Sequence, residues 1–464
     1  MFKRKAKPKA ILDFLHEKHE NPPNIIQVKN FMAQLKKSMY GPSTISLGEL
    51  EKWFNLNNSI PSDNCKSFVV NYVIDDYDDV NFRFMVSSKI LLKLALREEL
   101  IIHADATYKL IWQGFPVLLV GTTDRNRKFH LLGLAVCNNE ESDDFQFIFR
   151  TLKEAVQKIY NFKLIPKVLV ADASHSISNG FKRVFSDEVV IRMCWAHMRK
   201  AVKTKAETLS QKENVNKILT DIDSMQISKD ENTFLLAYKL FLKKWKHEVS
   251  FLKYFQKEWH NKNKNWYEGA SPGTPSTNNG LESINRVIKD EYTLRERLPL
   301  LRFCYLLMEI VESFSKKYEN NLQEFSDNVS IDLSTWTSAY QWARLNKKIE
   351  AVSSTSARKY LIPDRDYNSV NKKKLVTETE DNFDEYISKK GRYYNLSLPM
   401  NDEKWMDGLC TCPKFLKAYI CKHLLGIAIR LKLVCPPLEA RNLEIGKKRN
   451  RGRPSKAKKA LIKQ

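Results

Sequence analysis

Short apolar runs bounded by turn residues dominate one part of the chain, and apolar residues at helical spacing dominate most of the rest. The short runs predict strands over 100–108, 116–121, 129–136, 167–172 and 189–194. Short turns between the first three strands favour an antiparallel meander. Two amphipathic segments, one beginning at Asp143 and one over about 177–185, predict helices before the fourth and fifth strands.

This order of elements is that of an α/β domain of ribonuclease H type with a mixed sheet. From Ala196 to about Glu258 the chain is helical and highly charged, which predicts a large all-helical insertion. A break rich in Gly and Pro over 271–280 is followed by helices that continue to about Ile349.

Residues 11 to about 84 have a mixed and mostly helical pattern, with a break at Gly41-Pro42 between two helical segments. Such a pair can be a helix-turn-helix. The favoured interpretation is a helical collar packed on the next domain, because helix pairs of this kind are common.

Composition narrows the class of protein. The chain has 464 residues, of which 43% are hydrophobic, so it can build sizeable cores and wholesale disorder is excluded. Lys and Arg number 77 against 54 Asp and Glu, a formal charge of +23 that indicates a polyanionic partner. No apolar run approaches the roughly 18 residues of a membrane span, and no apolar segment follows the basic N-terminus. We therefore expect nucleic acid as partner, with no membrane association and no secretory signal.

Three acidic residues are candidates for chemistry. Asp105 and Asp172 end two predicted strands, and Glu282 lies in the first turn of a predicted helix. Carboxylates at strand ends suit a pair of Mg²⁺ ions in phosphoryl transfer, because these hard cations prefer charged oxygen ligands. Each residue alone also has a plainer interpretation, as a turn or capping Asp or as a Glu that favours the helix dipole.

The region from about 90 to 350 resembles the transposase domain of Mutator-like elements, a branch of the DDE-type transposases. The segments that carry the resemblance are HADATYK at 103–109, VADAS at 170–174, CWAHMRK at 194–200 and NNGLESIN at 278–285. The resemblance implies a ribonuclease H-like core and a metal-binding triad of Asp105, Asp172 and Glu282, which would hold Mg²⁺ or Mn²⁺.

Cys194 and His197 match a C-x2-H element of that family. Two ligands are too few for a structural zinc site. We expect His197 to lie beside the triad, where it contacts the scissile phosphate or orients Asp172. The plainer interpretation is a buried Cys and a core His.

A second group of candidate ligands is Cys410, Cys412, Cys421 and His423. Three thiolates and one imidazole satisfy tetrahedral Zn²⁺ with no open position, so the site is expected to be structural. The C-x-C…C-x-H spacing resembles the SWIM zinc finger, and Cys435 is expected to take no part.

The C-terminal tail carries nine basic residues and no acid over 447–464. Within it, Arg451, Gly452, Arg453 and Pro454 are similar to the core of an AT-hook, which binds the DNA minor groove. A nuclear-localisation signal is the equally plain interpretation, and the two are compatible. Tryptophans elsewhere are interpreted as core residues rather than as platforms for stacked bases: Trp195, Trp245, Trp259, Trp266 and Trp336.

The expected organisation has five parts. They are a basic arm and helical region over 1–90, the transposase domain over 91–350, a linker with a short strand or two over 351–400, the SWIM finger over 401–436 and the basic tail over 447–464. Within the transposase domain we expect the core at 98–200, the helical insertion at about 200–275 and the Glu282 helix with its followers at 278–350.

These features predict a nuclear DNA transposase that cuts and joins double-stranded DNA, with a homo-oligomer on DNA as a further expectation. The alternative is a domesticated DNA-binding transcriptional regulator that keeps the fold and the zinc module without catalysis.

Overall fold

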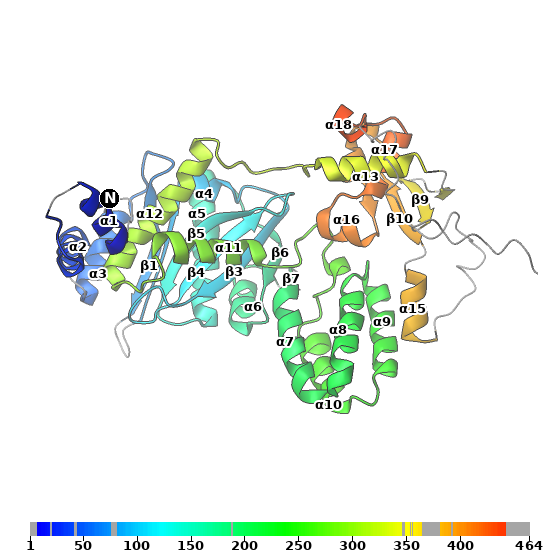
Figure 1. Cartoon of the computed structure of the whole chain (residues 1–464), viewed down its shortest axis with the longest axis horizontal. Coiled ribbons are helices and arrows are strands. Elements are labelled where there is room, and N and C mark those ends of the chain that lie inside the picture. The colour runs from blue at the N-terminus through cyan, green and yellow to red at the C-terminus, as the bar shows by residue number, and fades with distance from the viewer. Residues whose placement is uncertain are drawn as a thin grey trace, which may run out of the picture. The chain divides into compact units, whose positions relative to one another are not determined.

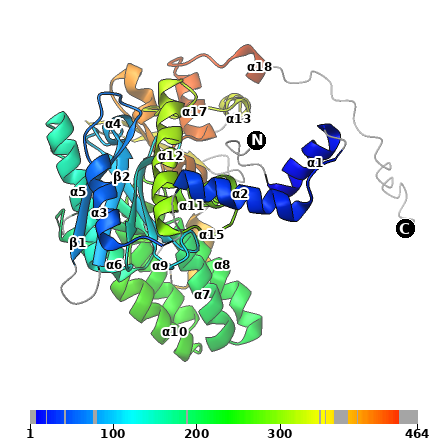
Figure 2. The ribbon, with the colours of Figure 1, turned by 90° about the vertical axis from the view of Figure 1, so that its left-hand side faces the viewer.

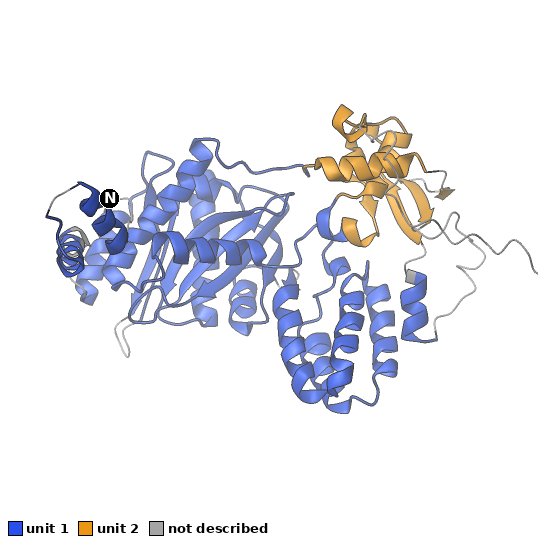
Figure 3. Cartoon of the chain, viewed as in Figure 1, with its two compact units in different colours: residues 1–329, 377–390, 416–419 blue, residues 330–376, 391–415, 420–464 orange. Residues whose placement is uncertain are grey.

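A computed structural model describes residues 7–18, 21–40, 44–75, 81–186, 189–345, 349–352, 354, 356–363, 381–390 and 393–441. The chain divides into two compact units, which are coloured separately in Figure 3. The first contains residues 1–329, 377–390 and 416–419, and the second contains the remainder. Within the described residues, no helix has the length and apolar character needed to cross a membrane.

The first unit is built on a seven-stranded sheet in the order β1-β2-β5-β4-β3-β6-β7 (Figure 1). Its strands are β1 (Ser67–Asp75), β2 (Asn81–Ser88), β3 (Leu100–Thr107), β4 (Val117–Thr123), β5 (Phe129–Cys137), β6 (Pro166–Ala171) and β7 (Val190–Met193). Neighbouring strands are antiparallel from β1 to β3, and β6 and β7 continue the sheet in parallel with β3. The α/β class, the mixed sheet and the predicted order of β3 to β7 with their helices are confirmed.

Two strands were missed in the region expected to be mostly helical. β1 and β2 form an antiparallel hairpin that pairs with β5, so the sheet begins before the expected core. The outer half of β1 alternates between half-buried and exposed residues from Val70 to Asp75. That period of two in burial is typical of a strand with one covered face, so this part of the expected helical region is a correction.

Helices cover both faces of the sheet (Figure 2). One face carries α5 (Ser142–Tyr160) and α6 (His175–Lys182), which pack against each other. The other carries α12 (Leu300–Glu319), and α11 (Asn279–Val287) contacts β3. Shorter elements connect them: α4 (Lys89–Lys93), a 3-10 turn at Glu268–Ala270 and a π-helical turn at Ile288–Tyr292.

The N-terminal helices are α1 (Pro8–Lys18), α2 (Ile25–Tyr40) and α3 (Leu47–Asn57). Ser46 and Glu49 form a capping box at the start of α3. Trp53 and Phe54 of this helix are buried against Phe84 of β2. This packing agrees with a helical collar on the sheet.

The helical insertion has a core of its own. It consists of α7 (Trp195–Leu209), α8 (Lys212–Gln226), α9 (Glu231–Lys244), α10 (Val249–Phe255) and a π-helical turn at Gln256–Lys262. Trp245, Trp259 and Trp266 are buried there, as their interpretation as core residues predicted. Phe383 and Tyr386 of α15 (Phe383–Lys390) join the same core, although the sequence placed them in a linker.

The second unit contains a four-stranded antiparallel sheet in the order β11-β10-β9-β8. The strands are β8 (Glu350–Val352), β9 (Arg358–Pro363), β10 (Tyr393–Leu398) and β11 (Leu409–Cys410). The helices of this region are α13 (Leu333–Ala343), α16 (Pro413–Ala418), α17 (Lys422–Arg430), α18 (Leu438–Arg441) and a 3-10 helix at Asp402–Asp407.

Candidate active site and metal centre

Two carboxylates lie at one edge of the sheet, at the ends of neighbouring parallel strands. His103 of β3 is in register with Val170 of β6. Continuing that register by two residues places Asp105 beside Asp172, because strands that run in parallel end at the same edge. The backbone N–H of Ser174 donates a hydrogen bond to Asp172 Oδ1 at 2.9 Å, which fixes this carboxylate at the start of α6.

The two aspartates influence each other electrostatically. Burial, and next the negative charge of Asp172, raise the pKa of Asp105 to about 7. A hydrogen bond from the Ala106 backbone and the nearby His197 oppose this shift. Since repulsion between like charges is part of the cause, this edge of the sheet favours the approach of a cation.

The third acidic residue comes from the other covering layer. Glu282 lies in the first turn of α11, and its Oε1 is 3.4 Å from His197 Nε2. These two side chains are 42% and 38% exposed, so water and a large substrate can reach them. The pKa of His197 is raised to about 9, first by the adjacent Cys194 side chain and further by the charges of Glu282 and Asp172.

Asn285, one turn after Glu282, joins α11 to the first strand of the site. Its Nδ2 donates to Asp105 Oδ2 at 3.3 Å, while its own Oδ1 is buried without a hydrogen-bond partner among the described residues. The structure thus brings Asp105, Asp172, Glu282 and His197 to one region of the first unit. The three carboxylates are not gathered tightly enough to offer one oxygen each within 4.8 Å of one another, unlike the cysteine cluster below.

The start of α11 is fixed by buried contacts that the sequence did not reveal. Asn278 is fully buried, and its Oδ1 lies 2.8 Å from His103 Nδ1. Its backbone N–H donates to Cys194 Sγ at 3.3 Å, so Cys194 is a buried acceptor. Gly280 follows, where a Cβ would lie only 2.8 Å from Phe129 Cβ. These residues occur inside the quoted motifs, but their roles depend on partners far away in sequence.

A buried ion pair supports the loop before α11. Arg192 of β7 lies 2.5 Å from Glu268, and both side chains are almost fully buried. Arg192 Nη1 also donates to the carbonyl oxygens of Ser271 and Thr274. Arg192 is a charged residue inside an apolar strand, and this position was the available signal that it has a buried partner.

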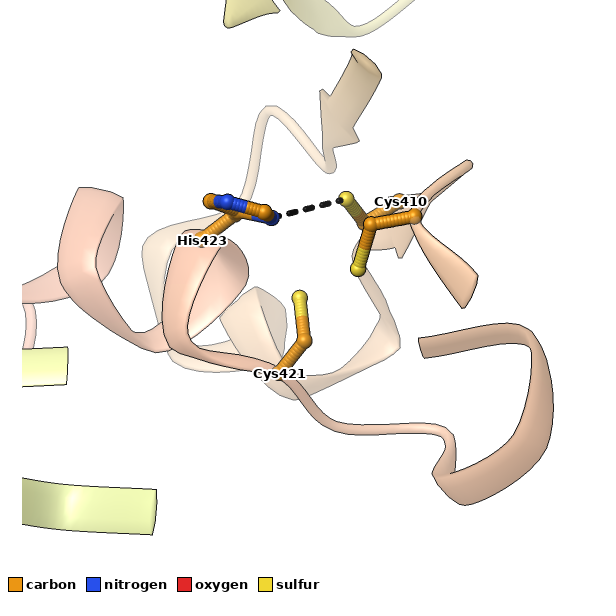
Figure 4. Close-up of side chains that lie close together, drawn as sticks. Cys410, Cys421 and His423 are labelled. Atoms are coloured by element: carbon orange, nitrogen blue, oxygen red, sulfur yellow. Dashed lines mark hydrogen bonds between the residues drawn. The ribbon is translucent and has the colours of Figure 1, made fainter. Parts of the chain in front are cut away.

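The second unit holds a compact cluster of soft ligands (Figure 4). Ligand atoms of Cys410, Cys412, Cys421 and His423 all lie within 4.8 Å of one another, and all four residues are buried. The distance from Cys410 Sγ to His423 Nδ1 is 4.0 Å. Ligand atoms around tetrahedral zinc stand roughly 3.5–3.8 Å apart at Zn–S and Zn–N lengths of about 2.3 and 2.0 Å. The cluster therefore fits zinc with small adjustments.

Local backbone and aromatic contacts orient these ligands. The N–H of Phe415 donates to Cys412 Sγ, and that of Leu424 donates to Cys421 Sγ, each at 3.4 Å. Burial raises the pKa of the Cys421 thiol, so a thiolate at this position needs a cation beside it. Cys435 is exposed and lies outside the cluster.

Two protein-family models match the chain, and each covers one of the two candidate sites in part or in full. Residues 101–201 match the MULE transposase domain, and residues 403–432 match the SWIM zinc finger. The matched part of the transposase domain includes Asp105, Asp172 and His197 and ends before Glu282.

Among curated proteins, none matches the chain. Among solved structures, the chain is similar to the Drosophila P element transposase strand transfer complex, with 10% sequence identity and a TM-score of 0.19. The similarity covers 69% of this chain and 82% of that chain. The AT-hook-like residues Arg451, Gly452, Arg453 and Pro454 lie outside the described residues.

Proposed function

We propose that the protein is a DNA transposase of the Mutator-like class, with a ribonuclease H-like core that cuts DNA and joins the resulting 3′-hydroxyls to target DNA. The observation that carries this proposal is that Asp105, Asp172 and Glu282 lie around His197 in one partly exposed region, next to residues 101–201, which match the MULE transposase domain. Double-stranded DNA is the partner, and a homo-oligomer on DNA and a nuclear location are parts of the same proposal.

The donor set fits a pair of divalent cations, either Mg²⁺ or Mn²⁺. Carboxylate oxygens are the ligands that these ions prefer, and a bound cation would offset both the burial of the Asp105 carboxylate and its repulsion by Asp172, which raise its pKa. The unpartnered Oδ1 of Asn285 is a further oxygen acceptor on the same helix as Glu282. When bound, such ions would polarise the scissile phosphate and promote deprotonation of the attacking water or 3′-hydroxyl.

The protein's own residues supply the geometry. Asp105 and Asp172 are fixed by the sheet, while the contacts of Asn278 and Asn285 fix α11 and with it Glu282. When protonated, His197 would neutralise part of the local negative charge and hold Glu282, whose Oε1 is 3.4 Å from its Nε2. We assign His197 a positioning role toward Glu282, and its contact with the scissile phosphate remains part of the proposal.

The SWIM finger is proposed to hold one structural zinc ion through Cys410, Cys412, Cys421 and His423. Four buried ligands leave no open position for a substrate, so this ion would order the fold of the finger. The finger and the basic tail would supply further contacts with DNA.

The test is metal-dependent cleavage of supercoiled DNA and of element-end DNA by wild-type protein and by Asp172→Asn and Glu282→Gln. We expect each variant to lose activity by a factor on the order of 10²–10³, as when one preorganised electrostatic group is removed from an active site. Glu231→Gln is the matched control, because Glu231 is also a first-turn glutamate, in α9, and should leave cleavage unchanged.

His197→Ala tests the positioning role in the same assay. Cleavage at the wild-type rate would remove that role. Equal inactivity of wild type, Asp172→Asn and Glu282→Gln would overturn the enzyme proposal and leave the DNA-binding regulator.

A further inference from the structure

A cleft of about 420 Å³ lies between α5 and the end of α6, and it is strongly basic. The second half of α5, the turn that leads to β6 and the C-terminal end of α6 line it. Its described lining has one acid, Glu154, and five cations: Arg150, Lys153, Lys158, Lys163 and Arg183. Asp143 pairs with Arg183 from outside the lining, and the net charge of this basic cleft stays positive when both acids are counted.

Three of the cations have no partner within the described residues. No hydrogen bond or ion pair there engages the side chains of Arg150, Lys158 or Lys163, and all three are exposed. Like charges repel one another, so cations that are gathered around one cleft without counter-charges favour an anion from outside the chain.

The other two cations are held in place by the protein. Lys153 Nζ donates to the carbonyl of Val184 at 3.0 Å and lies 5.5 Å from the centre of the Phe185 ring. An ammonium group has three N–H donors, so this contact leaves donors free for an anion. Arg183 is held by its pair with Asp143. The basic cleft therefore combines positioned and exposed cations.

The basic cleft is separated from the carboxylates by the length of β6. Lys163 precedes this strand and Asp172 follows it. A strand rises about 3.3 Å per residue, so Pro166–Ala171 spans roughly 20 Å. On a straight duplex this length corresponds to about six base pairs at 3.4 Å each. An anion in the cleft therefore occupies a site of its own.

We propose that the basic cleft binds the phosphate backbone of double-stranded DNA, as a second contact site away from the carboxylates. Arg150 and Lys158 are eight residues apart on α5, about 12 Å along the helix axis, so the cations can contact several successive phosphates. Contacts to phosphates carry no sequence information, so the site would hold DNA of any sequence. Its purpose rests on the proposed function, because a protein that cuts DNA needs to hold the duplex beyond the cut.

The lining favours a DNA backbone over an acidic protein. Lysine is depleted in protein–protein interfaces and aromatic residues are enriched there. Three of the five cations of the basic cleft are lysines, and none of its described lining residues is aromatic. The same lining offers no ring on which a base could stack, so the ligand is the backbone of a duplex.

Lysine modification read by mass spectrometry tests the basic cleft locally. The full chain is treated with an acylating reagent, with and without a duplex of random sequence, in Ca²⁺ so that no cleavage occurs. Lys158 and Lys163 should react several-fold more slowly with the duplex bound, because phosphates cover their ammonium groups. Lys239 of α9 and Lys253 of α10 are exposed controls and should react at an unchanged rate. Protection by a polyglutamate peptide and not by the duplex would overturn DNA as the ligand and indicate an acidic protein.

Salt dependence gives an independent measurement. In fluorescence anisotropy with a labelled duplex, the double variant Lys158→Ala/Lys163→Ala should reduce the slope of log affinity against log salt by about 1.8, or about 0.9 for each lost phosphate contact. Lys158→Arg/Lys163→Arg keeps both charges and should keep the slope. Lys239→Ala/Lys253→Ala is the matched control and should also keep it.

Unprotected Lys158 and Lys163 in the presence of bound duplex, or equal losses of slope in the cleft and control variants, would overturn the basic cleft as a DNA site. Because binding is read without cleavage, the site can be supported even if wild type never cuts DNA. Conversely, a wild type that cuts DNA while its cleft lysines stay unprotected would overturn the site and leave the proposed function standing.

Discussion

The two candidate metal centres are built in opposite ways. The cysteine cluster takes four buried ligands from one short stretch of chain between Cys410 and His423. The carboxylate region takes its ligands from β3, from the residue after β6 and from α11, and Glu282 is 42% exposed. The first centre is closed and compact, and the second is open and assembled from distant parts of the sequence.

This difference predicts different roles for the two metals. Zinc is expected to be needed for the finger to fold, whereas Mg²⁺ or Mn²⁺ is expected to bind an α/β unit that is already folded. Four soft ligands buried in a small module predict that binding of zinc and folding of the finger are coupled. The carboxylates sit on a large sheet with its own apolar core and on a helix fixed by buried hydrogen bonds. We therefore expect metal removal to unfold the finger and to leave the α/β unit folded.

The largest expected effect comes from breaking the cysteine cluster. Cys421→Ser removes a thiolate from the proposed zinc site, whose metal contributes on the order of 10 kcal/mol to folding in comparable modules. Zinc content should fall from about one ion per chain to near zero, and the finger should become sensitive to protease. The readouts are metal analysis of the purified chain and limited proteolysis followed by mass spectrometry of the fragments.

Cys435→Ser is the control for that change, since Cys435 is exposed and outside the cluster. It should keep both zinc and protease resistance. A Cys421→Ser variant with full zinc content would show that this residue is not a ligand. The cysteine cluster would then not be the closed four-ligand centre that distinguishes it from the carboxylate region.

The ligand sets of both centres could be proposed from sequence, but for different reasons. The spacing from Cys410 to His423 is local, so the pattern itself predicts that the ligands meet. Asp105 and Glu282 are far apart, and their meeting was implied by resemblance to a family. In the structure both residues lie near His197, and their role as metal ligands stays a prediction.

What could not be predicted is the support around the carboxylates. The contacts of His103 with Asn278 and of Arg192 with Glu268 join residues separated by large stretches of chain. The number of residues between the members of such a pair does not give their distance in the fold. The sequence also does not say whether a polar residue is buried or exposed. The hairpin of β1 and β2 was missed for another reason: Val73 is apolar on the exposed side of β1, so the letters do not alternate strictly between apolar and polar.

An intermediate effect is expected from the buried ion pair that supports the carboxylate region. Arg192→Met leaves Glu268 buried without its partner charge, and loss of one member of such a pair costs about 3–5 kcal/mol. Urea unfolding should show this loss in the α/β unit, and added Mg²⁺ should not restore it, because the support does not depend on the metal.

Arg199→Met is the matched control for that pair. Arg199 binds Asp223, but these side chains are 31% and 45% exposed, so the pair should contribute only about 0.2–1 kcal/mol. If Mg²⁺ restored the stability of Arg192→Met, folding of the carboxylate region would depend on its metal, as folding of the finger is expected to depend on zinc. The expected difference between the two centres would then be wrong.

The smallest expected effect tests whether the zinc centre has any support beyond its ligands. Gly426 of α17 faces α13, where a Cβ would lie 2.3 Å from Trp342 Cε3, and the Trp342 ring also contacts the His423 ring edge-on at 5.3 Å. Gly426→Ala forces these helices apart, and overpacking of this kind costs about 1–3 kcal/mol. The loss should appear as a lower midpoint of thermal unfolding of the finger with zinc still bound.

Gly48→Ala in α3 has nothing within 4 Å of the new Cβ and should be neutral or stabilising by up to about 1 kcal/mol. A finger unchanged by Gly426→Ala would mean that the metal alone holds it. A destabilised finger would mean that α13, which precedes the matched SWIM residues, belongs to the same folding unit.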